Sequence, residues 1–216
     1  LDFYEARGFF PHSKRILLRN PVSTLPNIRR DGQRAGTHFL YLGQIEDHKG
    51  VLFLLRTFKT FLRERAPCAV QLHIAGTGSR AEDVRRLSGD EPRIVFHGKV
   101  ERETLPRLFG GVHATIVPSL CYENSPTVIF ESFSFGVPVL ASRVEGIAEL
   151  IQEHENGLTF ETEDDGQLIE KMAWCVSHPE ELARMGRVAL QSLTGLSQQE
   201  YIGRLAALYE EKSVRS

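Results

Sequence analysis

The chain has 216 residues, of which 41% are hydrophobic and 25% charged, and its formal net charge is −2. This composition is ordinary for a soluble globular protein of one large domain or two small ones, and the near balance of charge excludes a global signal for nucleic acid. Three widely spaced cysteines without a CxxC motif argue against a disulfide framework and a zinc site, and they favour a reducing, cytoplasmic compartment. No apolar run is long enough to span a bilayer.

Short apolar runs alternate with amphipathic stretches along the chain. Runs rich in Val, Ile and Phe and bounded by Gly, Pro or polar residues predict strands at Ile16–Leu18, Phe39–Leu42, Val70–Ala75, Ile94–Phe96, Ala114–Val117 and Pro138–Ala141. Helical spacing of apolar residues predicts helices over Val51–Leu62, Leu168–Val176 and Ser197–Lys212. This repetition predicts an α/β fold, a Rossmann-like doubly wound parallel sheet whose ligands bind in the loops that follow the strands.

The loop after Phe39–Leu42 spans residues 43–50. Lys49 stands near its end, close to the N-terminus of the helix predicted from Val51. The helix dipole already favours an anion there, so a lysine strengthens the attraction for phosphate. Taken alone, this residue is also explained as a surface lysine before a helix.

The loop after Val70–Ala75 contains Gly76 and Gly78. Glycines let the backbone approach a ligand closely and expose its amide donors. The full dinucleotide fingerprint needs a third glycine and a following acidic residue. A tight turn therefore explains the pair as well as a binding loop does.

The strongest signal lies in the loop after Ala114–Val117. Ser125 is expected to cap the next helix and Pro126 to occupy its first position. The free amides of Thr127 and Val128 would then point toward a phosphate in front of the helix.

Two carboxylates flank this anion site. Glu123 stands in the loop before the helix, and Glu131 lies one to two turns inside it. A carboxylate accepts hydrogen bonds from two vicinal hydroxyls, as on a ribose or a hexose. Phosphate with carboxylates beside it fits a nucleotide sugar better than a bare phosphate, although spacing alone leaves open that both glutamates are solvated. A further loop, residues 143–149, is predicted to begin another helix, with Gly146 allowing close approach.

Together these loops resemble the C-terminal domain of the family 4 (GT4, group 1) retaining glycosyltransferases, which have the GT-B fold. The resemblance runs from about residue 16 to about residue 187, and its most specific parts are Pro118-Ser119, the Glu123-x7-Glu131 pair, Gly136-Val137-Pro138-Val139 and Gly146-Ile147-Ala148-Glu149. It implies an enzyme of two Rossmann-type domains with the active site between them, of which this chain supplies one.

The resemblance also implies roles for the matching residues. Glu131 would bind ribose hydroxyls, Glu123 would lie near the donor sugar, and Lys49 would contact the pyrophosphate, so that Glu123 and Lys49 act in catalysis. The other donor-binding positions are Gly43, Gln44, Gly76, Gly78, His97, Asn124, Ser125, Pro126, Thr127 and Val128. The donor would be a sugar of the UDP or GDP type, and no cofactor or metal is expected.

Two departures from the family pattern concern charge. Gln44 stands where the family often has arginine, so one charge-assisted contact to phosphate is missing. Glu145-Gly146 replaces the usual glycine pair and adds a carboxylate.

The expected organisation is an incoming helix, first strand and connecting loop over residues 1–36, a nucleotide-sugar-binding domain over 37–196, and a C-terminal helix over 197–216. The acceptor-binding N-terminal domain is expected to be a missing part of the same polypeptide.

The expected activity is hexosyl transfer with retention, in polysaccharide biosynthesis. The enzyme is not expected to bind nucleic acid, and peripheral membrane contact is left open. The isolated domain should bind nucleotide but transfer sugar poorly. The alternatives are a non-catalytic nucleotide-binding or interaction module, and a nucleotide-sugar epimerase or phosphorylase of the same general fold.

Overall fold

The computed structural model describes residues 7–9, 16, 18, 21, 35–65, 69–123 and 126–213. The chain forms two compact units, one comprising residues 24–194 and the other combining residues 1–23 with 195–216. In the second unit, helix α8 (Gln198–Ser213) covers the helix predicted at this end of the chain. Among the described helices, none combines the length and the apolar character that a membrane crossing requires.

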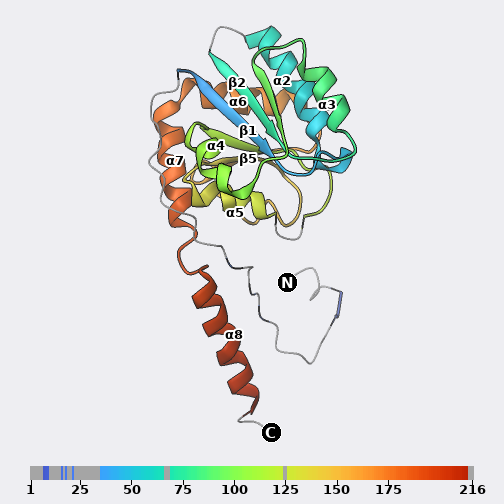
Figure 1. Ribbon diagram of the computed structural model, residues 1–216. Coiled ribbons are helices and arrows are strands. Elements are labelled where there is room, and N and C mark those ends of the chain that lie inside the picture. The colour runs from blue at the N-terminus through green and yellow to red at the C-terminus, as the bar shows by residue number, and fades with distance from the viewer. Residues whose placement is uncertain are drawn as a thin grey trace. The chain divides into compact units, whose positions relative to one another are not determined.

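The larger unit is built on a six-stranded parallel sheet (Figure 1). The strands are β1 (Thr37–Leu42), β2 (Val70–Ala75), β3 (Ile94–Gly98), β4 (Ala114–Val117), β5 (Val139–Ser142) and β6 (Gly157–Phe160). Their order in the sheet is β3-β2-β1-β4-β5-β6, which confirms the predicted doubly wound arrangement. The order reverses between β1 and β4, and ligands of such sheets bind beyond the carboxyl ends of the strands at this point.

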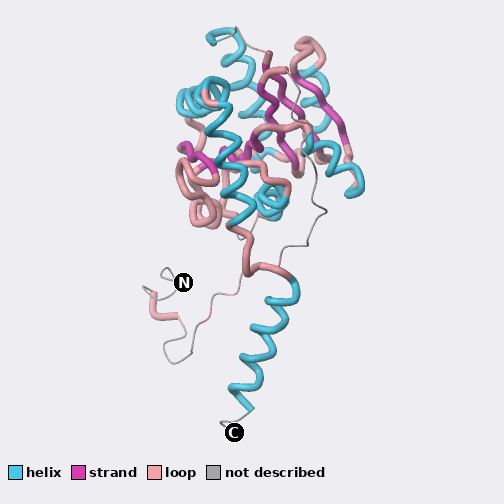
Figure 2. Tube along the Cα trace, turned by 90° about the vertical axis from the view of Figure 1, so that its left-hand side faces the viewer, coloured by secondary structure: helices cyan, strands magenta, loops and turns pink. Residues whose placement is uncertain are grey.

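Helices cover both faces of the sheet (Figure 2). One face carries α2 (Val51–Arg65), α3 (Ala81–Ser88) and α6 (Asp165–Ser177), and the other carries α4 (Leu105–Gly110) and α5 (Thr127–Ser134). Helix α7 (Pro179–Gln191) packs against α5 and α6. Two short 3-10 helices, η1 (Asp47–Lys49) and η2 (Arg102–Thr104), lie in the loops after β1 and β3.

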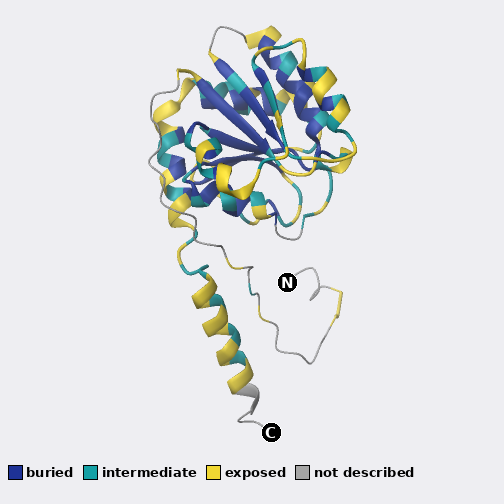
Figure 3. Ribbon diagram, viewed as in Figure 1, coloured by how far each residue is buried: buried dark blue, intermediate teal, exposed yellow. Residues whose placement is uncertain are grey.

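The two cores follow from the alternation of side chains along each strand. In β1, Phe39 and Tyr41 pack into the core beneath α2, whereas Leu40 packs into the core beneath α4. Figure 3 shows the strands buried and the outer surfaces of the helices exposed. The site therefore depends on the loops at the strand ends, because both faces of the sheet are covered.

Five of the predicted strands are confirmed, but other expectations from the sequence need correction. Ile16 and Leu18 belong to no strand, and the residue between them lies outside the described residues. Strand β6 was not predicted, because four residues beginning with a glycine give little pattern. The prediction that the loop of residues 143–149 begins another helix is wrong: residues 145–150 form turns, and Gly146 has a φ of +83°, which a right-handed helix does not allow.

Candidate functional site

Two hollows adjoin at the carboxyl ends of β1 and β4, where the strand order reverses. Their volumes are about 350 and 370 Å³. They share five lining residues, which are Leu42, Gly43, Gln44, Thr127 and Val128. We call the first the Lys49 hollow, because it also holds Lys49 and Glu123, and the second the Glu131 hollow.

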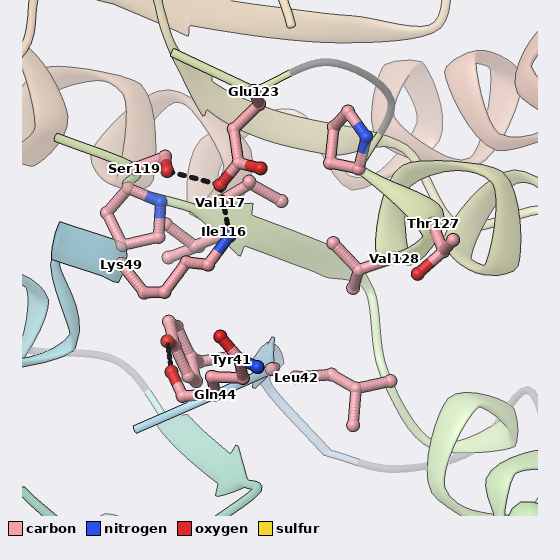
Figure 4. A pocket seen from close by; sticks show the side chains of 13 residues that line it. Tyr41, Leu42, Gln44, Lys49, Ile116, Val117, Ser119, Glu123, Thr127 and Val128 are labelled. Atoms are coloured by element: carbon pink, nitrogen blue, oxygen red, sulfur yellow. Dashed lines mark hydrogen bonds and ion pairs between the residues drawn. The ribbon is translucent and has the colours of Figure 1, made fainter. Parts of the chain in front are cut away.

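Lys49 and Glu123 form an ion pair in the Lys49 hollow (Figure 4). The Nζ of Lys49 lies 2.5 Å from Oε1 of Glu123, and the Ser119 hydroxyl donates to the same oxygen at 2.7 Å. The two paired side chains are 26% and 13% exposed, respectively. The two charged side chains in the described lining of this hollow therefore neutralise each other.

Backbone contacts hold Lys49 against the loop that carries Glu123. The carbonyl of His48, on one side of Lys49, accepts the amide of Leu120 at 2.9 Å. Gly50, on the other side, has a φ of +72° and lies against Pro118. Because both neighbours of Lys49 are fixed to the β4 loop, its ammonium group is held within reach of Glu123.

The loop of residues 143–149 also contacts Glu123. The amide of Glu123 donates to the carbonyl of Glu145 at 3.3 Å, and Glu145 itself is exposed. This bond uses the main-chain carbonyl, which a glycine at this position would also supply, so the departure from the family pattern adds only an exposed carboxylate.

Helix α5 begins at Thr127 and presents its amino end to both hollows. Pro126 is the N-cap residue, not the first helical residue as predicted, and its carbonyl accepts the amide of Ile129 at 3.1 Å. Within the described residues, no acceptor bonds the amides of Thr127 and Val128. The amino end of a helix favours an anion, so these two amides are candidate donors to one. The expected cap Ser125 and its neighbour Asn124 lie outside the described residues.

Glu131 lies half-buried in the second hollow. Burial raises the pKa of its carboxyl above the ordinary value, and the nearby Arg102 guanidinium opposes this rise. Arg102 begins η2 and lines the same hollow as Lys99. Lys99 pairs with Glu101 at 2.8 Å, whereas no ion pair engages Arg102 in the part of the chain that the structure describes. Arg102 is therefore a cation that the Glu131 hollow offers to a ligand.

The sequence interpretation missed Arg102, Lys99 and Thr77, which all line the Glu131 hollow. The available signal was the loop after β3, which is a further strand-to-helix connection and contains two basic residues just after Gly98. That loop was expected to act through His97. The structure places His97 outside both hollows, where its ring stacks on His73 and its Nε2 lies 3.0 Å from Nδ1 of His73.

The glycines of the site differ in what they contact. A Cβ on Gly76 would lie 1.8 Å from the carbonyl oxygen of Gly43, and a Cβ on Gly78 would lie 2.4 Å from that of Ile45. These two glycines therefore allow the second loop to pack against the first, and Gly78 lines neither hollow. Gly43 lines both, and the nearest protein atom to a Cβ there would be 3.8 Å away at Tyr41.

Tyr41, in the Lys49 hollow, is a further residue that the sequence interpretation missed. Its hydroxyl donates to the carbonyl of Gln44 at 2.5 Å (Figure 4). Burial, together with the negative charges of Glu123 and Glu46, raises the pKa of Tyr41 well above its ordinary value. The phenol therefore stays protonated and holds Gln44, an uncharged residue that lines both hollows.

The described residues also bear on whether the protein holds a metal ion. Across the described ranges, no group of three or more His, Cys, Asp or Glu side chains is arranged to hold a metal ion.

Comparison with known families identifies the chain. Residues 36–178, more than half of its length, match the glycosyl transferases group 1 family, and the chain belongs to this family. The resemblance to GT4-type glycosyltransferases with the GT-B fold, drawn from the loop motifs, is thereby confirmed.

Three similar proteins illustrate the relationship. D-inositol 3-phosphate glycosyltransferase of Thermobifida fusca is 26% identical over 202 residues, which are 88% of this chain and 46% of the relative. The match to the structure of sucrose-phosphate synthase from Thermosynechococcus elongatus covers 100% of this chain and 57% of the synthase chain, with a TM-score of 0.83 and 21% identity. The match to Anabaena HepE in complex with UDP covers 82% of this chain and 49% of the HepE chain, with a TM-score of 0.72 and 18% identity. The chain spans less than half the length of the curated relatives it matches.

Proposed function

We propose that this chain is the donor-binding domain of a glycosyltransferase and that it holds a nucleoside-diphosphate sugar across the two hollows. The observation that carries the proposal is the position of α5. Thr127 and Val128, the first two residues of this helix, line both hollows, with Glu123 in one hollow and Glu131 in the other. An anion bound at these amides has a carboxylate acceptor on either side, which suits a diphosphate that joins two hydroxyl-bearing groups.

The parts of the ligand follow from this arrangement. We assign the nucleoside to the Glu131 hollow, where the carboxylate accepts hydrogen bonds from the vicinal ribose hydroxyls. The diphosphate lies over the shared residues, and the sugar lies in the Lys49 hollow beside Glu123. The HepE complex contains UDP, which supports a uridine diphosphate as the nucleotide, and a guanosine diphosphate stays the alternative expected from the sequence.

The proposed reaction is transfer of a hexosyl unit to an acceptor with retention at the anomeric carbon. The bond between the anomeric carbon and the diphosphate oxygen breaks, a bond from the acceptor oxygen forms on the same face of the sugar, and the proton of the acceptor hydroxyl passes to the departing diphosphate. Negative charge develops on the departing diphosphate, where the α5 amides and Lys49 can stabilise it. We assign acceptor binding to a part of the protein beyond this chain, since the relatives are more than twice as long as their matched parts. The cytoplasmic location stays a prediction.

Calorimetric titration and thermal unfolding of the chain with UDP, GDP, ADP and their sugars test the proposal. A nucleotide at 100 times its Kd should raise the free energy of unfolding by about 2.7 kcal/mol. Glu131→Ala should weaken binding, whereas Glu170→Ala, which removes an exposed carboxylate from α6 on the opposite face of the sheet, should not. Absence of any shift at millimolar nucleotide would contradict the proposal. Binding without transfer by the longer protein would favour a non-catalytic module.

A further inference from the structure

We propose that Glu123 competes with the diphosphate for Lys49, so that the carboxylate weakens nucleoside-diphosphate binding and promotes release of the product. This inference rests on the proposed function. It goes further by giving Glu123 a part in controlling phosphate affinity, in addition to contact with the sugar.

The geometry of the ion pair carries the first step. Lys49 donates to Oε1 of Glu123, and the flanking residues of Lys49 are fixed to the β4 loop by Leu120 and Pro118. These backbone contacts keep Lys49 beside the loop that carries Glu123, so the two charged groups stay within reach of each other. A phosphate that binds Lys49 must break the ion pair with Glu123. This is costly because the Glu123 side chain is only 13% exposed, so little water solvates the carboxylate that is left without Lys49.

The charges around the two hollows carry the second step. Five charged side chains belong to their described lining: Lys49, Glu123, Lys99, Arg102 and Glu131. Two of the three cations, Lys49 and Lys99, are already paired with carboxylates. An arriving diphosphate therefore meets a neutral pair at the Lys49 end, and Gln44 adds no charge to compensate.

The third step distinguishes the donor from the product. When a sugar is attached, its hydroxyls can donate to Glu123 and replace the bond from Lys49, while Ser119 keeps its own bond to Oε1. After transfer the sugar leaves, and Glu123 has only Ser119 and Lys49 as donors in the described lining. Glu123 then draws Lys49 back, and the diphosphate loses a cation.

The test is the Kd of UDP and GDP for the wild-type chain and its variants, by calorimetry. Glu123→Gln keeps the shape and an acceptor for Ser119 but removes the charge, and it should tighten binding about fivefold, the fold-change that corresponds to an ion pair of about 1 kcal/mol. Lys49→Met should weaken binding. In the Lys49→Met background, Glu123→Gln should have no effect, because the residue for which Glu123 competes is gone. The matched control, Glu145→Gln, removes an exposed carboxylate from the adjoining loop and should change Kd far less.

Ser119→Ala gives an independent test that does not alter either charge. Without the Ser119 bond, Glu123 depends more on Lys49, so diphosphate binding should weaken. The opposite directions expected for Ser119→Ala and Glu123→Gln could not both come from general damage to the site.

The outcomes separate the two proposals. If the wild-type chain binds neither UDP nor GDP, both the proposed function and this inference are overturned. If the wild type binds but Glu123→Gln leaves the Kd unchanged or raises it, only the competition is overturned. Tightening that persists in the Lys49→Met background would show plain repulsion of phosphate by Glu123 and would equally overturn the competition.

Discussion

Gly50 lies in the loop after β1 and Pro118 lies in the loop after β4, and the backbones of these two residues are in direct contact. A Cβ on Gly50 would lie 1.8 Å from the carbonyl oxygen of Pro118. This contact joins the loop after β1 to the loop after β4 at the point where the strand order reverses. It is the reason that Lys49, next to Gly50, reaches a carboxylate on the other loop.

Gly50→Ala should therefore destabilise the fold and disrupt the site together. A left-handed φ costs an L-residue about 1–2 kcal/mol, and the forced separation from Pro118 adds an overpacking cost, so we expect a loss of about 3 kcal/mol in the free energy of unfolding. Denaturant unfolding measures this loss. The control is Gly89→Ala, where φ is −60° and the nearest atom to the new Cβ is 3.5 Å away. Equal stability of the two variants would show that the contact between the loops is not tight.

Gly43→Ala should separate ligand binding from folding. Because the nearest protein atom would be 3.8 Å from the new methyl group, the free energy of unfolding should change by less than about 0.5 kcal/mol. The methyl group would occupy the shared lining of both hollows, so nucleotide binding should weaken. Gly76→Ala is the matched comparison and should destabilise the fold, since its Cβ would meet the carbonyl of Gly43. Unchanged nucleotide affinity in Gly43→Ala would mean that the ligand does not approach this backbone.

Glu131 should make the fold less stable as the pH rises. Burial raises the pKa of its carboxyl, although Arg102 opposes the rise, so the folded chain holds this proton more readily than the unfolded chain. Stability therefore falls as the pH rises from the ordinary carboxyl pKa through the raised one. Glu131→Gln should raise the free energy of unfolding at neutral pH and have no effect well below the ordinary pKa, while weakening nucleotide binding. Urea unfolding across this pH range measures the difference.

Glu153 provides a comparison of opposite sign. Burial acts to raise the pKa of its carboxyl, but hydrogen bonds from Lys171 and Thr159 outweigh it and lower the pKa. Its stabilising contribution is present above the unfolded pKa and is lost as the pH falls through the lowered one. Glu153→Gln should therefore lower the free energy of unfolding at neutral pH. If both glutamine variants shifted stability in the same direction, burial would not be the dominant cause at Glu131.

Arg102 should contribute to nucleotide affinity through its charge. It lines the Glu131 hollow, close to the shared amides of α5, and we expect Arg102→Gln to weaken UDP or GDP binding about fivefold at low salt and less at high salt. Calorimetry at two salt concentrations measures this effect. Arg107→Gln, at an exposed position on α4, is the control. If the two substitutions weakened binding equally, Arg102 would act only through the overall electrostatic field of the protein and not through contact with the nucleotide.

Local patterns predicted much of the fold but not its irregular segments. Buried strands such as β2 and β4 have continuous apolar runs, whereas β6 begins with Gly157 and is short, so burial by its neighbours decides its conformation. Apolar spacing over residues 143–149 is compatible with a helix, but the backbone turns at Gly146. A hydrophobic pattern reports which side chains are buried, and it does not report φ at a single glycine.

In the candidate site too, some features could be predicted from the sequence and others depend on the tertiary structure. Glu123, Thr127 and Glu131 could be found from the sequence because their relation is local, set by a loop followed by one helix. The bond between Lys49 and Glu123, 74 residues apart, and the meeting of Arg102 with Glu131 could not. Both depend on which strands are neighbours and where the strand order reverses. Local propensity does not encode that choice, because it is made when the whole sheet packs between its two layers of helices.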